Sequence, residues 1–357
     1  MKNLFEEAKE QSQTKPRTGV NKKVMNLAAS WYVAMDSKAL VKKPKAIDLF
    51  GEHLVAWRDQ KGQPVIMKRY CSHMGASLAM GKVIDNCIQC PFHHWRFDNV
   101  GQCISIPDLD HIPPTFRQTI YVTEERYGYI WVWYGTQTPL FPLVEYKAAE
   151  SQRHNYMTFR FSYHTKTTVL RVIENIFDQY HGPALHQLPT TSLQLTVLDE
   201  NYLAQQSELP IKKEAWFGVL TEVQVKRYFG LIGVVANVLG IKFKTITIYI
   251  NGYPSGTLAK FFFNGEEKFQ TLQSSTPINE NHTIWNGLFT IKKTGNIFLD
   301  LAYYLLFGLQ NGLTVYQDVP VWNNLNADEG GAYIKHDKGV LKFREFYQSW
   351  VNKVEVE

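Results

Sequence analysis

The chain has 357 residues, 45% of them hydrophobic and 14% aromatic, which is enough for two packed cores rather than one. Its formal net charge is only +5 and no block of like charges occurs, which argues against a charge-driven nucleic-acid partner or membrane tail. No apolar run reaches the roughly 20 residues of a membrane span, so the longest two, 228–240 and 297–309, are expected in the core. Because the N-terminus lacks the apolar stretch of a secretory signal, we expect a cytoplasmic protein.

The character of the sequence changes twice along the chain. Residues 1–26 are polar without sustained apolar periodicity, which predicts a loosely held lead-in. Residues 27–138 contain short apolar stretches separated by Gly, Asp and Asn turns, and this pattern predicts a small all-β domain. Pro139 and Pro142 mark the expected boundary of a second domain, 139–357.

The second domain is predicted to combine strands with helices. Residues 245–250 alternate as a strand does, and Asn264-Gly265 between two apolar stretches predicts a type I′ hairpin turn. We therefore predict an α+β fold, an antiparallel sheet with helices. Three stretches are interpreted as helices: 168–180, 296–317 and 338–351.

All four cysteines lie within one stretch of 33 residues: Cys71, Cys87, Cys90 and Cys103. Such clustering in a long chain indicates metal binding rather than a disulfide framework. Cys71-Ser72-His73 is followed, after sixteen residues, by Cys90-Pro91-Phe92-His93. One Cys-x-His paired with one Cys-x-x-His fits a Rieske [2Fe–2S] cluster, in which two thiolates hold one iron and two imidazoles hold the other.

A structural zinc site is the alternative, because Cys87-Ile88-Gln89-Cys90 is also a Cys-x-x-Cys. The usual zinc spacings do not include a tight Cys-x-His, and the glycines near both motifs favour two loops that approach one cluster. Cys87 and Cys103 are interpreted as buried small hydrophobic residues. His94 is expected to point away from the cluster.

A second constellation of polar residues lies downstream. On a helix, Asn175, Asp178 and His181 are spaced three apart and would share one face. Gly182-Pro183 is expected to end this helix, so that His186 turns back toward the same point. Two convergent histidines supply two corners of a facial triad for non-haem iron. The alternative is that both histidines only cap a helix end, but a cluster needs an electron acceptor, which favours the iron site.

The facial triad also needs a carboxylate, which spacing alone does not locate. The candidates are Asp300, Asp318, Asp328 and Glu329. Asp300 lies in an apolar helical run and could face inward, whereas Asp328 and Glu329 precede two glycines and indicate an exposed turn. We choose Asp318, because it sits where the predicted helix ends and is flanked by apolar residues on both sides.

Asp178 has an expected role of its own. A carboxylate one helical turn before His181 can accept the second N–H of that imidazole and so orient the ring. The alternative is an aspartate on a helix surface.

At these residues the chain resembles the Rieske oxygenase α-subunits, over both domains. The resemblance implies that Cys71, His73, Cys90 and His93 ligate the cluster, and that Asn175, Asp178, His181 and His186 fill the family pattern Asn-x-x-Asp-x-x-His-x₄-His beside mononuclear Fe(II). It also implies a Rieske domain followed by a helix-grip catalytic domain, in a homotrimer. Electrons would then cross between subunits, with Asp178 linking His181 to the partner subunit's His93.

Longer stretches outside the metal motifs point to a subfamily. Residues 27–35, 125–135 and 305–310 resemble the arylamine N-oxygenases of antibiotic biosynthesis. That likeness implies an O₂-dependent monooxygenase that takes a small apolar aromatic amine through hydroxylamine and nitroso levels to a nitro product. The stretch around Asp318 and Trp322 is similar to steroid-acting Rieske monooxygenases, so the alternative is C–H oxygenation or desaturation of a sterol-like or other apolar molecule. A plain electron carrier is disfavoured, because it needs no second iron site.

The electrons must come from a separate protein. No flavin or nicotinamide fingerprint is present, because Gly230-Leu231-Ile232-Gly233 lacks the third glycine and the strand–turn–helix setting. We therefore expect a ferredoxin, an NAD(P)H-dependent flavin reductase, or both as partners. The cations near the cluster motifs either dock an acidic ferredoxin or are solvated surface charges: Lys68, Arg69, Lys82 and Arg96.

Overall fold

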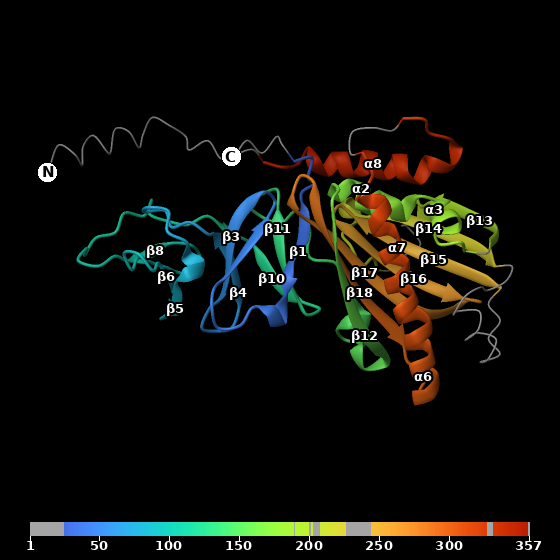
Figure 1. The fold of residues 1–357 in the computed structure, drawn as a ribbon, viewed down its shortest axis with the longest axis horizontal. Coiled ribbons are helices and arrows are strands. Elements are labelled where there is room, and N and C mark those ends of the chain that lie inside the picture. Colours follow the sequence, from blue (N-terminus) through green and yellow to red (C-terminus); the bar gives the residue numbers. More distant parts are fainter. Residues whose placement is uncertain are drawn as a thin grey trace.

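The structure, a computed structural model, describes residues 25–188, 190–199, 201–202, 208–225, 244–326 and 331–355. The predictions for most of the lead-in, for the apolar run 228–240 and for Asp328 and Glu329 lie outside these residues. Elements up to residue 134 form three small sheets, and those from residue 156 onward form one large antiparallel sheet with helices (Figure 1). The predicted α+β class, an all-β part followed by a helix-grip part, is confirmed.

The N-terminal part consists of three antiparallel sheets of three or four short strands. The first has the order β1-β11-β10, the second β2-β3-β4-β9 and the third β5-β6-β7-β8. The predicted cluster motifs follow β4 and β6, so the second and third sheets position them. The bounds are β1 Ser30–Asp36, β2 Lys45–Leu49, β3 Glu52–Arg58, β4 Pro64–Lys68, β5 Lys82–Ile84, β6 Cys87–Gln89, β7 Arg96–Phe97, β8 Cys103–Ser105, β9 Ile120–Tyr121, β10 Thr123–Arg126 and β11 Tyr129–Tyr134.

The C-terminal part is built on a seven-stranded sheet of order β12-β18-β17-β16-β15-β14-β13. The predicted hairpin turn joins β16 to β17: Asn264 and Gly265 have φ of 50° and 83°, the left-handed values that a type I′ turn requires. The bounds are β12 Tyr156–Thr165, β13 Thr190–Val197, β14 Phe217–Val225, β15 Thr245–Tyr253, β16 Gly256–Phe263, β17 Glu266–Asn279 and β18 His282–Lys292.

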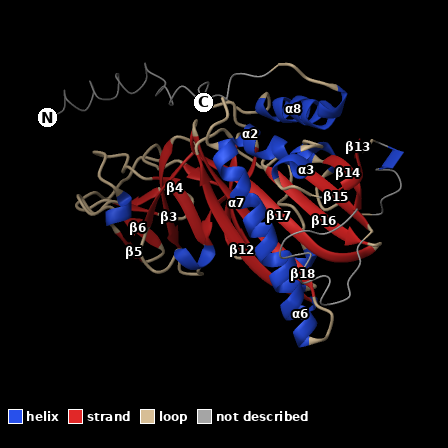
Figure 2. Ribbon diagram, turned by 45° about the vertical axis from the view of Figure 1, so that its right-hand side comes forward, coloured by secondary structure: helices blue, strands red, loops and turns tan. Residues whose placement is uncertain are grey.

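Helices cover one face and the upper edge of this sheet, and a long helical rod crosses it diagonally (Figure 2). No helix among the described residues is long and apolar enough to cross a membrane. The α-helices are α2 Val169–Glu174, α3 His181–Leu185, α6 Ile297–Tyr303, α7 Gln310–Trp322 and α8 Lys338–Val351. A π-helix, η8 Tyr304–Leu309, joins α6 to α7, and short 3₁₀ turns are η2 Ser37–Ala39, η3 Leu78–Met80, η4 Lys147–Ala149, η5 Arg153–Asn155, η6 Asn175–Phe177, η7 Lys213–Ala215 and η9 Lys335–Asp337.

Helix α8 has the bounds that the apolar spacing predicts, and it contacts the first described residues of the chain. Val340, Phe343, Tyr347 and Trp350 form its buried face. The Tyr347 hydroxyl donates to the carbonyl of Asn26 at 3.0 Å, which holds the start of the described chain against the helix. The core under α8 is continuous with that of the first sheet, so the two parts of the chain share buried side chains.

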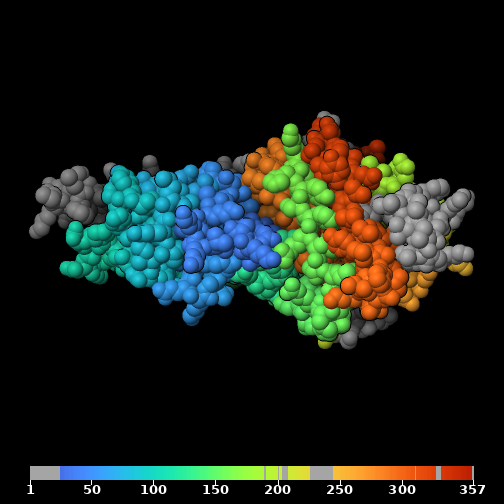
Figure 3. All heavy atoms as spheres, turned by 60° about the horizontal axis from the view of Figure 1, so that its bottom comes forward, coloured from blue at the N-terminus to red at the C-terminus, as the bar shows by residue number. Residues whose placement is uncertain are grey.

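The expectation that residues 297–309 lie in the core is wrong for most of that run. Only Leu306, Phe307 and Gly308 are buried, whereas Ile297 and Phe298 are 77% and 80% exposed. Leu306 and Phe307 pack against Phe263, Phe269 and Ile291 of the sheet, and this contact covers only one stripe of the helix. Figure 3 shows the orange surface of α6 beside the green strand β12.

Candidate metal centres and their cavity

The two cluster motifs occupy tight loops that face each other. Within the first loop, the amide of Gly75 donates to the carbonyl of Cys71 at 2.9 Å, and the amide of Cys90 donates to the carbonyl of Trp95 at 2.8 Å in the second. A Cβ added to Gly81 would lie 2.1 Å from the carbonyl oxygen of Gln89, just before Cys90. Glycine at this position is therefore what allows the loops to approach each other so closely.

The four predicted cluster ligands divide into a buried half and an outer half. Cys71 and Cys90 are buried, and the His73 and His93 rings lie outside them with centroids 4.7 Å apart. Burial raises the pKa of the Cys71 thiol to about 12, and the adjacent Cys90 adds to the increase. The sulfurs of Cys71 and Cys90 are thus buried next to each other, and the imidazoles of His73 and His93 lie nearer the surface. This arrangement fits a Rieske cluster that exchanges electrons through its histidine side.

The remaining residues near the cluster loops lie where the sequence predicts. Cys87 and Cys103 are buried, and their thiols donate to the carbonyls of Asp85 and Ser105. His94 is exposed. Because Cys87 has a backbone partner of its own, the zinc alternative loses the Cys-x-x-Cys pair on which it rests.

Three of the four candidate docking cations are paired within the chain. Lys68 lies 3.6 Å from Glu52, Arg69 pairs with Asp48, and Arg96 lies 2.9 Å from Asp85. This favours the interpretation of these cations as ordinary surface charges over a ferredoxin-docking patch.

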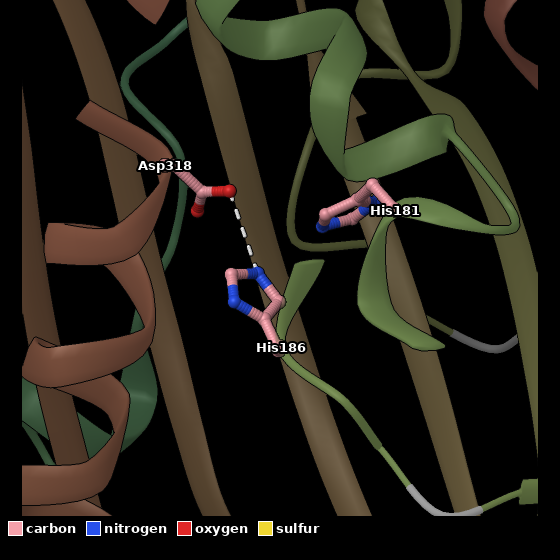
Figure 4. Close-up of side chains that lie close together, drawn as sticks. All are labelled: His181, His186 and Asp318. Carbon is pink, nitrogen blue, oxygen red and sulfur yellow. Dashed lines mark ion pairs between the residues drawn. The ribbon is translucent and has the colours of Figure 1, made fainter. Parts of the chain in front are cut away.

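His181, His186 and Asp318 converge on one point, as the sequence predicts. Their ligand atoms all lie within 4.8 Å of one another, with the histidines on and just after α3 and the aspartate on α7 (Figure 4). Asp318 is buried, and its Oδ1 lies 3.4 Å from Nε2 of His186. At that separation Nε2 makes no normal hydrogen bond and is left buried without a partner. The site therefore offers two imidazoles and one carboxylate, and Nε2 of His186 is a ligand atom that lacks a partner among the described residues. This set fits a mononuclear non-haem iron.

The ring of each histidine is oriented through its other nitrogen. Nδ1 of His181 faces the backbone carbonyl of Asp178 at 3.0 Å, and Nδ1 of His186 faces Oε1 of Gln317 at 2.9 Å. Burial lowers the pKa of His186, but Asp318 and Gln317 together outweigh it, so the net pKa is raised. Sequence reasoning missed Gln317, although it directly precedes Asp318.

Two of the expectations around Asp178 need correction. The helix ends at Glu174, and Asp178 is extended, so its carbonyl rather than its carboxylate meets the ring of His181. The Asp178 carboxylate accepts instead from the amide of Tyr180 at 2.9 Å. Gly182-Pro183 does not break a helix but lies in the first turn of α3, where proline needs no N–H partner.

One further polar side chain, Asn175, supports the site, whereas Asp300 does not. Nδ2 of Asn175 donates to Oδ1 of Asp318 at 3.3 Å, which ties the segment after α2 to α7. Asp300, the alternative carboxylate, instead accepts from the amide and hydroxyl of Thr294 near the start of α6. The structure therefore brings Asp318, and not Asp300, to the histidines.

A buried ion pair fixes α2, which leads into the site. The carboxylate of Glu174 is only 7% exposed and accepts from Nε and Nη2 of Arg344 on α8 at 2.6 and 3.0 Å. It also accepts from Arg171. Because two arginines hold this buried carboxylate, the position of Glu174 at the end of α2 is well defined.

A cavity of about 540 Å³ borders His181, His186 and Asp318 and is also lined by strands of the large sheet. Its walls are mainly apolar, with Ile248 and Phe269 from the sheet and Phe307 from η8. No lysine or arginine borders it among the described residues. Such a cavity suits a neutral, mostly apolar molecule of small to medium size.

Comparison with known proteins agrees with these centres. A Rieske [2Fe-2S] domain model matches residues 30–117. The chain is similar to aminopyrrolnitrin oxygenase PrnD of Pseudomonas fluorescens, with 42% identity covering 98% of both chains. It is also similar to cholesterol 7-desaturase nvd 1 of Ciona intestinalis, with 25% identity covering 90% of this chain and 68% of the relative.

Solved structures show the same fold. Dicamba monooxygenase bound to 3,6-dichlorosalicylic acid superimposes with a TM-score of 0.70 and 17% identity, covering 91% of this chain and 97% of that one. Sequence identity over nearly the full length of PrnD, the Rieske domain and this fold lead to one conclusion. The chain belongs to the Rieske non-haem iron oxygenases, enzymes that use a [2Fe–2S] cluster, a mononuclear iron and O₂ and take their electrons from a separate reductase or ferredoxin.

Proposed function

We propose that this chain transfers oxygen to the nitrogen of a neutral aromatic amine. The observation that carries the proposal is the 42% identity, end to end, with an enzyme named as aminopyrrolnitrin oxygenase. The apolar cavity beside His181, His186 and Asp318 supports it, because a neutral arylamine enters such a space without desolvating a charge. Repeated transfer would take the amine through hydroxylamine and nitroso levels to a nitro product. In each transfer one atom of O₂ goes to nitrogen and the other leaves as water, with two electrons from the separate reductase or ferredoxin and two protons. The second transfer also releases one water as the nitroso level is reached.

We assign the metal-binding roles as follows. Cys71, His73, Cys90 and His93 would hold the cluster, and His181, His186 and Asp318 would hold the iron. Once bound, the iron would supply the activation of O₂ that no side chain can provide. The chain's own contributions are to hold three donors on one side, to keep Asp318 in place through Asn175, and to line the remaining space with apolar groups that exclude water.

The proposed assembly is a homotrimer in which electrons pass between subunits. The sheet of β5–β8, which carries the cluster loops, lies at one end of the molecule, and α3 lies toward the other (Figure 1). A long separation within one chain favours transfer to a partner. Asp178 stays the proposed bridge between His181 and the partner subunit's His93, now with its backbone carbonyl on the His181 side. The domain limits 27–138 and 139–357 and a cytoplasmic location also remain predictions.

The proposal is tested by turnover under ¹⁸O₂ with a surrogate ferredoxin and reductase. The enzyme is offered a panel of arylamines and sterol-like molecules, and the products are analysed by mass. Label on nitrogen, as hydroxylamine, nitroso or nitro product, is the expected result. Label only on carbon, or desaturation without label, would replace the proposal with the alternative function.

That alternative, C–H oxygenation or desaturation of a sterol-like molecule, is supported by one comparison. The second relative is named a cholesterol desaturase and matches 90% of this chain, although at 25% identity. The apolar cavity alone does not separate the two substrates. The position of the ¹⁸O label in the product separates them.

A further inference from the structure

One polar spot interrupts the apolar floor of the cavity. Thr257 on β16 and Gln273 on β17 are directly opposite each other in the antiparallel ladder, and both border the cavity. Directly opposite residues on one face have their Cβ atoms only about 5 Å apart, so the hydroxyl and the amide act on the same small volume.

Neither side chain of this pair has its hydrogen-bonding capacity filled. Thr257 is fully buried, and its hydroxyl has no hydrogen-bond partner in the part of the chain that the structure describes. The side-chain amide of Gln273 makes no hydrogen bond to any described residue. A buried polar group without a partner is costly, so the Thr257 hydroxyl indicates a polar partner on this side of the cavity, and the half-buried Gln273 amide offers a second hydrogen-bonding group beside it.

The neighbours of the pair keep it open and set it among aromatic rings. In the same row across the sheet, Gly252 on β15 faces Thr257 and Gly287 on β18 faces Gln273. A Cβ at Gly287 would lie 2.3 Å from the ring of Trp285, so the glycine lets that indole lie across the cavity floor beside Gln273. A planar aromatic ligand can therefore stack there while its polar group reaches the pair.

The charge around the cavity disfavours an anionic ligand. No lysine or arginine lines it among the described residues, whereas the Asp178 and Asp318 carboxylates do. A carboxylate on the part of the ligand that lies away from the metal centre would thus be buried without a countercharge. Threonine hydroxyls and glutamine amides both donate and accept, so they suit a neutral hydroxyl, amide or ring N–H.

We infer that Thr257 and Gln273 form a specificity-determining subsite that binds a second, neutral hydrogen-bonding group of the substrate, separate from the amine that faces the iron site. The inference deepens the proposed arylamine oxygenation and rests on it. It narrows the substrate class from apolar arylamines to neutral arylamines that carry a second polar group.

The test measures binding without turnover. Holoenzyme with an oxidised cluster and no reductase is titrated by calorimetry with 4-aminobiphenyl and with 4′-amino-4-hydroxybiphenyl, which differ by one remote hydroxyl. We expect the hydroxylated probe to bind about tenfold more tightly. In Thr257→Val and Gln273→Leu, this preference should fall to about onefold while the affinity for 4-aminobiphenyl stays within about twofold.

The matched control is Thr271→Val. Thr271 is also buried on β17 with an unpartnered hydroxyl, but it does not border the cavity. Its variant should keep the wild-type preference. Equal affinity of wild type for both probes, or equal loss in Thr271→Val and Thr257→Val, would overturn the inference. Because no oxygen transfer is measured, this result is independent of whether the ¹⁸O₂ label appears on nitrogen.

Discussion

Replacing Gln317 by leucine should weaken iron binding without unfolding the protein. Its Oε1 lies 2.9 Å from Nδ1 of His186, which fixes a proton on that nitrogen and leaves Nε2 free to face Asp318. Loss of such a supporting partner lowers metal affinity by about 10- to 100-fold. That range corresponds to about 1.4–2.8 kcal/mol. Gln317 is exposed on α7, and leucine and glutamine have similar helix propensities, so the metal-free fold should be unaffected.

The assay is iron retention against a graded series of chelators, with thermal unfolding of the metal-free protein measured in parallel. Gln317→Glu is the control, because it keeps an oxygen acceptor at the same position and should retain iron at least as well as wild type. If Gln317→Leu retained iron as wild type does, the ring of His186 would be held by something other than Gln317.

Three further predictions concern the supports of the two centres. Asp178→Ala should retain both metals yet slow turnover by orders of magnitude, as checked by metal analysis beside steady-state rates; unchanged rates would remove its bridging role. Arg344→Met leaves the buried Glu174 with one partner and should destabilise the fold by about 2–4 kcal/mol, measured by urea unfolding; an unchanged midpoint would show that the pair is dispensable. Cys87→Ala should keep the visible absorption of the cluster, whereas Cys90→Ala should lose it. Loss of the absorption in Cys87→Ala would support Cys87 as a metal ligand, as the zinc interpretation requires.

Much of this molecule is predictable because local rules and tertiary structure agree. Asn264-Gly265 forms the turn that its φ preferences favour, and α8 buries the side chains that recur at helical spacing. The metal motifs are also readable, since ligand chemistry restricts the residue types and their spacing. Asp318 could be chosen among several carboxylates because apolar neighbours on both sides indicate burial.

Other features depend on contacts between distant segments. Helix α2 ends at Glu174 and the chain is extended at Asp178 although no glycine or proline marks either position, and the Glu174 carboxylate there is paired with Arg344 of the distant α8. The role of Gln317 depends on a histidine 131 positions away. The exposure of α6 follows from how much of its surface the sheet can cover, which periodicity alone does not reveal.

A single-turnover experiment tests the central claim most directly. Holoenzyme with a chemically reduced cluster is mixed with ¹⁸O₂ and an arylamine in the absence of any reductase, while the cluster absorption and the product mass are followed together. We expect cluster oxidation to be accompanied by a labelled hydroxylamine, and Asp318→Asn to keep the cluster but form no product. Cluster oxidation in the wild type with label on carbon, or labelled nitrogen product from Asp318→Asn, would contradict it.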